Sequence, residues 1–381
     1  MPVKFMRKPC RLNKARVTEL EFKKDQITRI LDKTLERVND GSFGAKELSR
    51  TLLGMGKIVR KIQKERRRKR MNVNLYAFSQ TLLDEAMQPK EEIFHPFITA
   101  SQPILKEFTS RELMNVAYAL AMMGYLPRLE GGTALHFVAD AALLKIEEFD
   151  SQELSNLLWS YATLSFHHWK LFHGAADSIM KRDLGEFDSR ELGNVVWSFG
   201  KADIIHPGLF KSLGDAFVKG DLQMIDPQIL RDVVWGYAMA KELHPTLFRT
   251  IGDALVGLDD LRDLRPNVLS TLVWSFASLG IPHSKLFERV GDTIISFKNL
   301  REFKSYDLSN AVWAFSAAGV EQIELFRKVG DAIVDLDELN KFTIEELTDI
   351  QWAYETAKVS HGAMLTRVDD AIAELSKDDS S

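Results

Sequence analysis

Five histidines recur at one place in the sequence pattern, each three residues before a Leu or Met. They are His168, His206, His244, His283 and His361. Imidazoles in a row could bind metal ions or serve as general bases. However, equivalent positions in stacked helices lie roughly 10 Å apart, whereas zinc needs ligand nitrogens at about 2.0–2.1 Å. Two of these histidines are followed directly by proline, which marks a helix start, so we expect capping or turn roles and no metal site.

An aspartate also recurs once in every unit of the pattern. The positions are Asp140, Asp177, Asp215, Asp253, Asp292, Asp331 and Asp370. One interpretation is a row of acceptors facing a ligand. The other is a hydrogen bond within the repeats, to the indole N–H of a Trp or to the next helix's N-terminus. We favour the second, because a residue that is the same in every unit cannot discriminate among different positions of a partner.

Sequence motifs of enzymes are missing. The chain has no Gly-rich phosphate loop and no HExxH, Gly-x-Ser-x-Gly or Cys-x-x-Cys pattern. Its one cysteine, Cys10, allows neither a disulfide framework nor a thiolate metal cage and fits a reducing compartment. We therefore expect no enzymatic activity, no cofactor and no small-molecule substrate. Since no run of 18 apolar residues occurs, we also expect no membrane span.

The charge of the chain is unevenly distributed. Residues 1–70 hold 22 Lys and Arg against 8 Asp and Glu, a net charge of +14, whereas the remainder holds 28 against 46, a net of −18. The basic charge peaks at Arg66, Arg67, Arg68, Lys69 and Arg70. This cluster could contact nucleic acid, act as a nuclear-import signal or be a solvated helix end. Six Lys or Arg and no acid precede Glu19, which suits an organelle transit peptide except that serine is nearly absent.

A sequence repeat must position all of these residues. Six tryptophans follow one another at intervals of 38 or 39 residues: Trp159, Trp197, Trp235, Trp274, Trp313 and Trp352. The same phrase surrounds them, as in 154–162 and 192–199, and a seventh copy has Tyr118 in the Trp position. A fixed period of this length is typical of stacked supersecondary units. We predict an all-α, right-handed α-solenoid of helix-turn-helix repeats.

Each repeat is expected to contain two helices. The first begins with a capping box after a Phe, as in the sequence from Phe149 to Glu153, and is apolar on most sides. The second contains an internal glycine in four successive units, at Gly214, Gly252, Gly291 and Gly330. Glycine costs about 1 kcal/mol in a helix relative to alanine, so we expect close approach of a neighbouring helix there.

These patterns divide the chain into four parts. We predict a basic, partly helical segment over 1–70 and a cryptic or capping repeat over 71–105. An array of about seven repeats follows over 106–375, and 376–381 form a disordered tail.

The phrase Leu-x-Asn-x-x-Trp-x-Phe/Tyr-Ala at this period resembles the octotricopeptide-type repeats of algal and protist organelles. It is also similar to the heptatricopeptide repeats and to the FAST-kinase-like, RAP-associated helical repeats. The resemblance covers residues 106–375. It implies an RNA-binding factor of a mitochondrion or chloroplast that acts in the processing, stability or translation of transcripts.

If RNA lies along the array, the first helix of each repeat should supply the side chains that select bases. Positions three before and one after the Trp share one face of that helix. The candidates at these positions are Asn115, Asn156, Ser160, Asn194, Ser198, Asp232, Thr271, Ser275, Asn310 and Asp349. Alternatively, the Asn is a polar spacer or bonds to the adjacent helix.

Two partners therefore remain open for the predicted surface. Single-stranded RNA agrees with the resemblance and with the basic segment. A protein partner, bound on a scaffold within a ribosomal or RNA-editing assembly, agrees with the net charge of −18 beyond residue 70, because phosphate contacts supply much of the affinity for nucleic acid.

Overall fold

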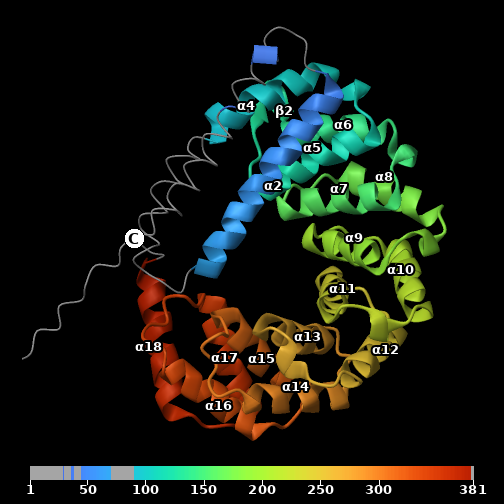
Figure 1. Ribbon diagram of the computed structural model, residues 1–381. Coiled ribbons are helices and arrows are strands. Elements are labelled where there is room, and N and C mark those ends of the chain that lie inside the picture. The colour runs from blue at the N-terminus through green and yellow to red at the C-terminus, as the bar shows by residue number, and fades with distance from the viewer. Residues whose placement is uncertain (1–28, 30–35, 38–43, 70–89, 379–381) are drawn as a thin grey trace, which may run out of the picture. The chain divides into compact units, whose positions relative to one another are not determined.

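The computed structural model describes residues 29, 36–37, 44–69 and 90–378 (Figure 1). Almost all regular structure in this part of the chain is helical, and consecutive helices pair into repeats. The prediction of an all-α helical-repeat fold is confirmed. The handedness of the array stays a prediction.

The chain forms two compact units that divide at Gly174, within the predicted array. Helix α8 (Trp169–Met180) spans this division. The predicted boundaries at residues 70 and 105 stay predictions, but the predicted disordered tail is wrong in part. Helix α18 (Gly362–Asp378) continues through 376–378, where the Ser376 hydroxyl donates to the Ile372 carbonyl at 2.7 Å. Residues 379–381 lie outside the described residues.

In the first unit the helix over residues 45–69 packs along the helix over residues 110–123. Its α-helices are α2 (Ala45–Lys69), α4 (Lys90–Ser101), α5 (Ser110–Met123), α6 (Ala134–Leu143) and α7 (Ser151–Thr163), with η1 (Gln102–Glu107) and η2 (Ile146–Glu148) between them. Helix α2 buries Leu48, Leu52 and Val59, which recur at helical spacing. A Cβ at Gly56 would lie 3.1 Å from the Ala119 Cα, so the backbones of α2 and α5 approach closely.

The basic cluster lies at the end of helix α2. Arg66, Arg67, Arg68 and Lys69 are its last four residues. Their side chains, and Arg70 as a whole, lie outside the described residues.

A short β-hairpin interrupts the helices of the first unit. Strands β1 (Arg128–Leu129) and β2 (Gly132–Thr133) are antiparallel, and Arg128 pairs with Thr133. Gly131, in the turn, has φ +86°, which an L side chain rarely adopts. This hairpin lengthens the connection from α5 to α6, which accounts for the 41 residues between Tyr118 and Trp159.

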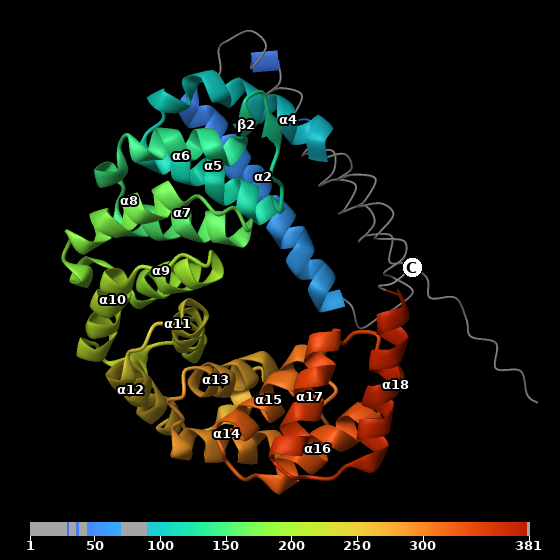
Figure 2. The same cartoon turned by 180° about the vertical axis from the view of Figure 1, so that it is seen from behind.

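The second unit consists of two helical layers, each packed from repeat to repeat (Figures 1 and 2). The A layer holds the first helix of each repeat: α9 (Ser189–Lys201), α11 (Pro227–Ala240), α13 (Pro266–Ser278), α15 (Ser305–Ala317) and α17 (Ile344–Thr356). The B layer holds the second: α10 (Pro207–Lys219), α12 (Pro245–Val256), α14 (Ser284–Ser296), α16 (Ile323–Val334) and α18. Short 3-10 turns, η3 (Leu184–Glu186), η4 (Leu222–Met224) and η5 (Leu261–Asp263), precede three of the A helices.

The A helices begin at the predicted caps. In α9, the Asp188 carboxylate accepts from the Glu191 amide at 2.8 Å, and the Glu191 carboxylate accepts from the Asp188 amide at 3.0 Å. The preceding Phe187 is buried, as expected for a hydrophobic staple. Helices α11 and α13 start instead with Pro227 and Pro266, at a position where the missing amide N–H costs no helical hydrogen bond.

A histidine joins each of several B helices to the one before it. His283 Nδ1 accepts from the Leu286 amide at 3.2 Å and so caps α14. Since Nδ1 accepts, Nε2 carries the proton and donates to Asp253 Oδ1 of α12 at 3.2 Å. The ring lies against Gly252, where a Cβ would be only 2.4 Å from the imidazole. The predicted capping role of the histidine is confirmed at this joint. The aspartate has a structural role, as predicted, but its partner is the histidine side chain at the start of the next repeat's B helix and not the indole of a Trp.

The same joint recurs along the B layer. His244 donates to Asp215, and His361 donates to Asp331, each at 3.2 Å. One repeat differs: Gln322 replaces the histidine and donates to Asp292 at 3.2 Å, without capping its own helix. We call these four contacts the inter-repeat joints. The recurrent glycine makes room for the His or Gln side chain of the next repeat, and not for the close approach of a neighbouring helix that was predicted there.

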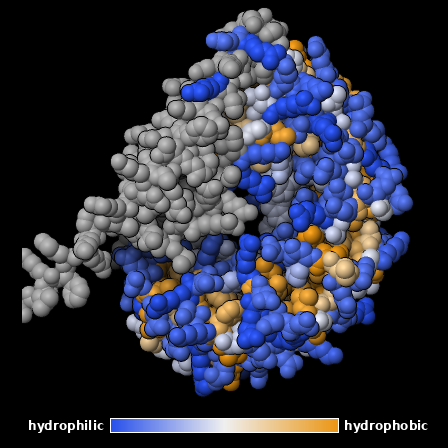
Figure 3. All heavy atoms as spheres, in the orientation of Figure 1, coloured by the Kyte–Doolittle hydropathy of each residue, from blue (hydrophilic) through white to orange (hydrophobic). Residues whose placement is uncertain are grey.

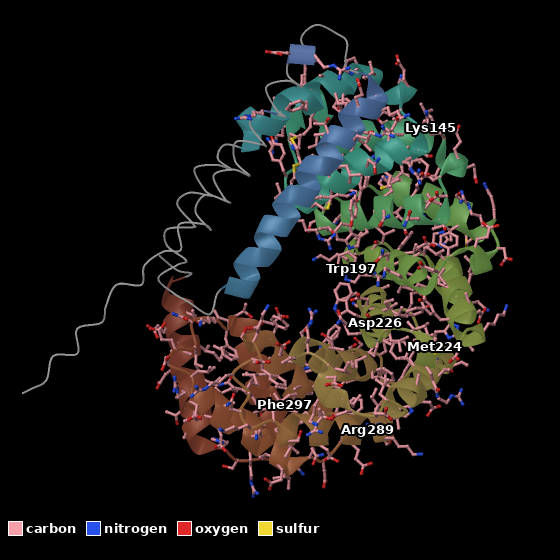
Figure 4. All side chains as sticks on the ribbon, viewed as in Figure 1. Lys145, Trp197, Met224, Asp226, Arg289 and Phe297 are labelled. Carbon is pink, nitrogen blue, oxygen red and sulfur yellow. The ribbon has the colours of Figure 1, made fainter. Side chains whose placement is uncertain are left out.

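Basic side chains of the B layer also bond to the preceding repeat. The Arg289 guanidinium, labelled in Figure 4, donates to the carbonyls of Val256 and Leu258 at the end of α12. Lys328 and Arg367 make equivalent contacts one and two repeats later. Cations at helix C-termini are favoured by the helix dipole, so these three charges are used within the fold.

We expect Gly252→Ala to destabilise the protein by about 1–3 kcal/mol, because the new Cβ would displace the His283 ring from its cap. Gly54→Ala is the matched control, since nothing lies within 4 Å of a Cβ there. It should be neutral or stabilise α2 by up to about 1 kcal/mol. Thermal unfolding followed by circular dichroism measures both. Equal midpoints for the two variants would contradict the packing described.

The inter-repeat joint can be dissected with His283. His283→Gln should keep a donor to Asp253, as Gln322 does for Asp292, and lose the helix cap, at about 1 kcal/mol. His283→Ala removes both bonds and should cost more. Urea unfolding of the wild type and both variants should rank them in that order. A glutamine variant no more stable than the alanine variant would refute the donor role.

Candidate nucleic-acid interface

Partly exposed tryptophans form a row along the A layer. In the second unit they are Trp197, Trp235, Trp274, Trp313 and Trp352, all half-buried except the last, which is 41% exposed. Ring centroids are 6.0 Å apart for Trp197 and Trp235, 6.5 Å for Trp274 and Trp313, and 6.0 Å for Trp313 and Trp352, with interplanar angles of 29–41°. Figure 4 labels Trp197 on α9. We call this row the aromatic stripe.

The first unit has its own pair of such rings. Tyr118 and Trp159 lie 5.3 Å apart at 47°. Arg60 of α2 donates to the Tyr118 hydroxyl at 3.0 Å.

The predicted base-selecting residues lie beside these rings, one helical turn earlier. Residues three apart share a helix face, and six of the seven side chains at this position are half-buried: Asn115, Asn156, Asn194, Asp232, Asn310 and Asp349. The seventh, Thr271, is only 8% exposed. Within the described residues, neither the four Asn carboxamides nor the six indole N–H groups of the repeat tryptophans make a hydrogen bond. The alternative role for Asn, a bond to the adjacent helix, is therefore not found there.

The three serines predicted to select bases do not lie on this face. Ser160, Ser198 and Ser275 are fully buried. Each hydroxyl donates to the carbonyl four residues earlier, at 2.6, 2.6 and 2.8 Å. Their placement on the binding face was wrong, because the position after the Trp faces the neighbouring A helix.

The small residues at that position allow the A helices to pack closely. Gly236 of α11 is equivalent to Ser198, and a Cβ there would lie 2.7 Å from the Val196 carbonyl oxygen of α9. Close packing also explains hydrogen bonds between A helices, such as that from the Ser316 hydroxyl to the Ala353 carbonyl at 2.7 Å. The row of small residues sets the spacing of the tryptophans.

Burial and neighbouring charges perturb the two acids of the stripe. Burial raises the pKa of Asp232, and Arg231, 2.9 Å away, opposes this shift. Burial also raises the pKa of Asp349, and the carboxylates of Glu345 and Glu346 add to the effect. The acid at α17 thus has like charges nearby, whereas the acid at α11 has an arginine partner.

The sequence predicts no ligand contact for the tryptophans. The spacing carried the missing signal, because Asn and Trp three residues apart must share a face. A half-exposed Asn therefore implies a half-exposed Trp.

In Figure 3 polar side chains dominate the visible surface, and apolar ones are exposed among them in several places.

Among the described residues, no three His, Cys, Asp or Glu side chains are grouped so as to hold a metal ion. In the same part of the chain, no helix is both long and apolar enough to cross a membrane.

We expect Asn194→Ala to change the free energy of unfolding by less than about 0.5 kcal/mol, because its carboxamide bonds to nothing in the described chain. Asp188→Ala on the same helix should cost about 1 kcal/mol, because it removes the cap of α9. Chemical denaturation of both variants tests this difference. A cost for Asn194→Ala as large as that for Asp188→Ala would mean that the asparagine has a structural role.

Comparison of the chain with models of known protein families gives no match, and comparison with curated proteins gives no significant match.

Proposed function

We propose that the A layer binds single-stranded RNA along the aromatic stripe and the polar row beside it. One observation carries the proposal. The recurrent His, Asp and Arg side chains of the B layer bond within the fold, whereas the Asn carboxamides and Trp indoles of the A layer keep their hydrogen-bonding groups free within the described chain. Side chains that recur in each repeat and make no hydrogen bond within the described chain are available to a ligand built of repeating units, such as a strand of nucleotides.

The chemistry of the stripe suits nucleotides. A carboxamide offers both a donor and an acceptor to the edge of a base. Aromatic side chains stack on bases of any sequence, at about 1–3 kcal/mol per base. In this proposal the constant tryptophans supply affinity, and the alternation between Asn, at positions 194 and 310, and Asp, at position 232, supplies selectivity.

The ring spacing limits how the bases can lie. A base sandwiched between two parallel rings needs them about 7 Å apart, twice the contact distance of about 3.5 Å between carbons. The measured pairs are 6.0–6.5 Å apart and tilted. Bases would therefore rest against the exposed sides of the indoles, with the Asn one turn away at the base edge, and not insert between them.

Exposed basic residues of helix α9 are the candidates to hold phosphates in the second unit: Arg190 and Lys201. The first unit has exposed arginines of its own, Arg60 and Arg111. The cluster Arg66–Arg70 stays a candidate RNA contact of the first unit, as the sequence indicates. An organellar location and a role in transcript processing, stability or translation rest on the sequence resemblance.

An extended peptide is the second candidate ligand. The net charge of −18 beyond residue 70 favours it over RNA, and a carboxamide can bond to a peptide amide as well as to a base. A peptide rich in Lys could also place its side chains on the indoles through cation–π contacts.

The test measures binding of a fluorescein-labelled 20-nucleotide RNA of mixed sequence to the full chain between 50 and 200 mM salt. We expect binding that weakens with salt and that falls about 5- to 160-fold in Trp197→Ala, the loss of one stacking contact. Trp169→Ala is the matched control, because Trp169 is 63% exposed and lies on α8, which is not a helix of the A layer.

Three results would count against the proposal. The wild type could fail to bind RNA at 50 mM salt, or Trp169→Ala could weaken binding as much as Trp197→Ala. The third result is tight binding of a Lys-rich 12-residue peptide that RNA does not displace. It would support the second candidate.

A further inference from the structure

The first turn of each A helix carries a residue that is positively charged at one end of the second unit, uncharged in the middle and negatively charged at the other end. It stands seven residues before the Trp, on the same side of the helix. From α9 to α17 the residues are Arg190, Gln228, Asn267, Tyr306 and Glu345. Each is exposed or half-buried. The row thus passes from a cation through two amides and a phenol to an anion at equivalent positions of five successive helices.

Helix α9 presents two cations on the side that faces the ligand. Arg190, Asn194, Trp197 and Lys201 follow at spacings of four, three and four residues, which is one continuous line along a helix. With a rise of 1.5 Å per residue, Arg190 and Lys201 lie about 16 Å apart along the axis. Both are exposed, and neither makes an ion pair with a described residue. Their charges are therefore available on either side of the indole.

Helix α17 carries acids near the same positions: Glu345 is equivalent to Arg190 and Asp349 to Asn194, and Glu355 stands one residue before the position equivalent to Lys201. Glu345 and Glu355 are exposed, and Asp349 is half-buried between them in sequence. No described cation forms a salt bridge with any of the three. The raised pKa of Asp349, caused by burial and by Glu345 and Glu346, agrees with an uncompensated cluster of negative charge.

The three A helices between these ends are close to neutral on this face. On α11 the only acid, Asp232, is paired with Arg231 at 2.9 Å. Helices α13 and α15 present Asn267, Ser278 and Asn310. The charge difference along the stripe therefore comes from its two ends.

We infer that the stripe of the second unit is polarised: Arg190 and Lys201 hold phosphates at α9, and Glu345, Asp349 and Glu355 exclude the strand from α17. The inference rests on the proposed RNA binding and specifies which A helices the RNA strand contacts. The strand contacts α9, α11, α13 and α15. Trp352, although the most exposed ring of the stripe, takes no base, because a phosphate beside it would face three carboxylates.

The first experiment measures the affinity of the full chain for single-stranded oligouridines of 3 to 12 nucleotides across a salt series. The double variant Arg190→Gln/Lys201→Gln should bind at least tenfold more weakly. The slope of log affinity against log salt should fall by about 1.4, the value for two lost contacts to a single strand. The control Arg249→Gln/Lys285→Gln removes two exposed cations of the B layer and should change neither quantity.

The second experiment removes the charge at α17. The triple variant Glu345→Gln/Asp349→Asn/Glu355→Gln should bind more tightly, and its affinity should reach a plateau at an oligouridine about one nucleotide longer, since repeats of this kind take roughly one base each. The control Glu288→Gln/Asp259→Asn/Asp263→Asn neutralises three exposed acids elsewhere in the unit and should not lengthen the plateau. Trp352→Ala should leave the affinity of the wild type unchanged.

The outcomes separate the inference from the proposal beneath it. If the wild type does not bind RNA, both are overturned. If it binds, the inference alone is overturned by an unchanged salt slope in the α9 variant or by an unchanged plateau in the α17 variant. A loss of affinity in Trp352→Ala as large as in Trp197→Ala would also overturn it.

Discussion

The contact on which the second unit depends is an imidazole seated on a glycine. A neutral imidazole has one acceptor and one donor nitrogen, and in His283 the acceptor caps its own helix while the donor holds Asp253 of the preceding repeat. The glycine is needed because a Cβ would occupy the place of the ring. One residue thereby sets where a helix starts and how far it lies from its neighbour.

This arrangement separates the two layers chemically. In the B layer the recurrent polar and charged side chains bond to helix C-terminal carbonyls or to each other. Arg289, for example, donates to a carbonyl at the end of α12. In the A layer, contact between helices is made by small residues such as Gly236 and Ser198, which leaves the larger polar and aromatic side chains to solvent. A ligand surface can therefore vary from repeat to repeat without disturbing the bonds that hold the repeats together.

Much of this could be predicted from the sequence because the signals are local. The period, the capping box of Asp188 and the capping role of His283 depend on residues a few positions apart. The orientation of the A helices could not be predicted in the same way. Whether the residue after each Trp faces solvent or a helix depends on how closely that helix packs, and the buried Ser198 shows that it packs at that position. The hairpin at 128–133 was also missed, since two-residue strands leave no periodic pattern.

The substitution of Gln322 for histidine makes one joint unlike the others. Gln322 keeps the bond to Asp292 but leaves the first amides of α16 without a side-chain acceptor. In a linear array the stability is approximately the sum of the interaction free energies between neighbouring repeats. A weaker interaction between two repeats therefore lowers the stability locally, at that pair of repeats. Local opening should accordingly be easier between α14 and α16 than between α12 and α14, where the same kind of basic side chain is joined by a histidine cap.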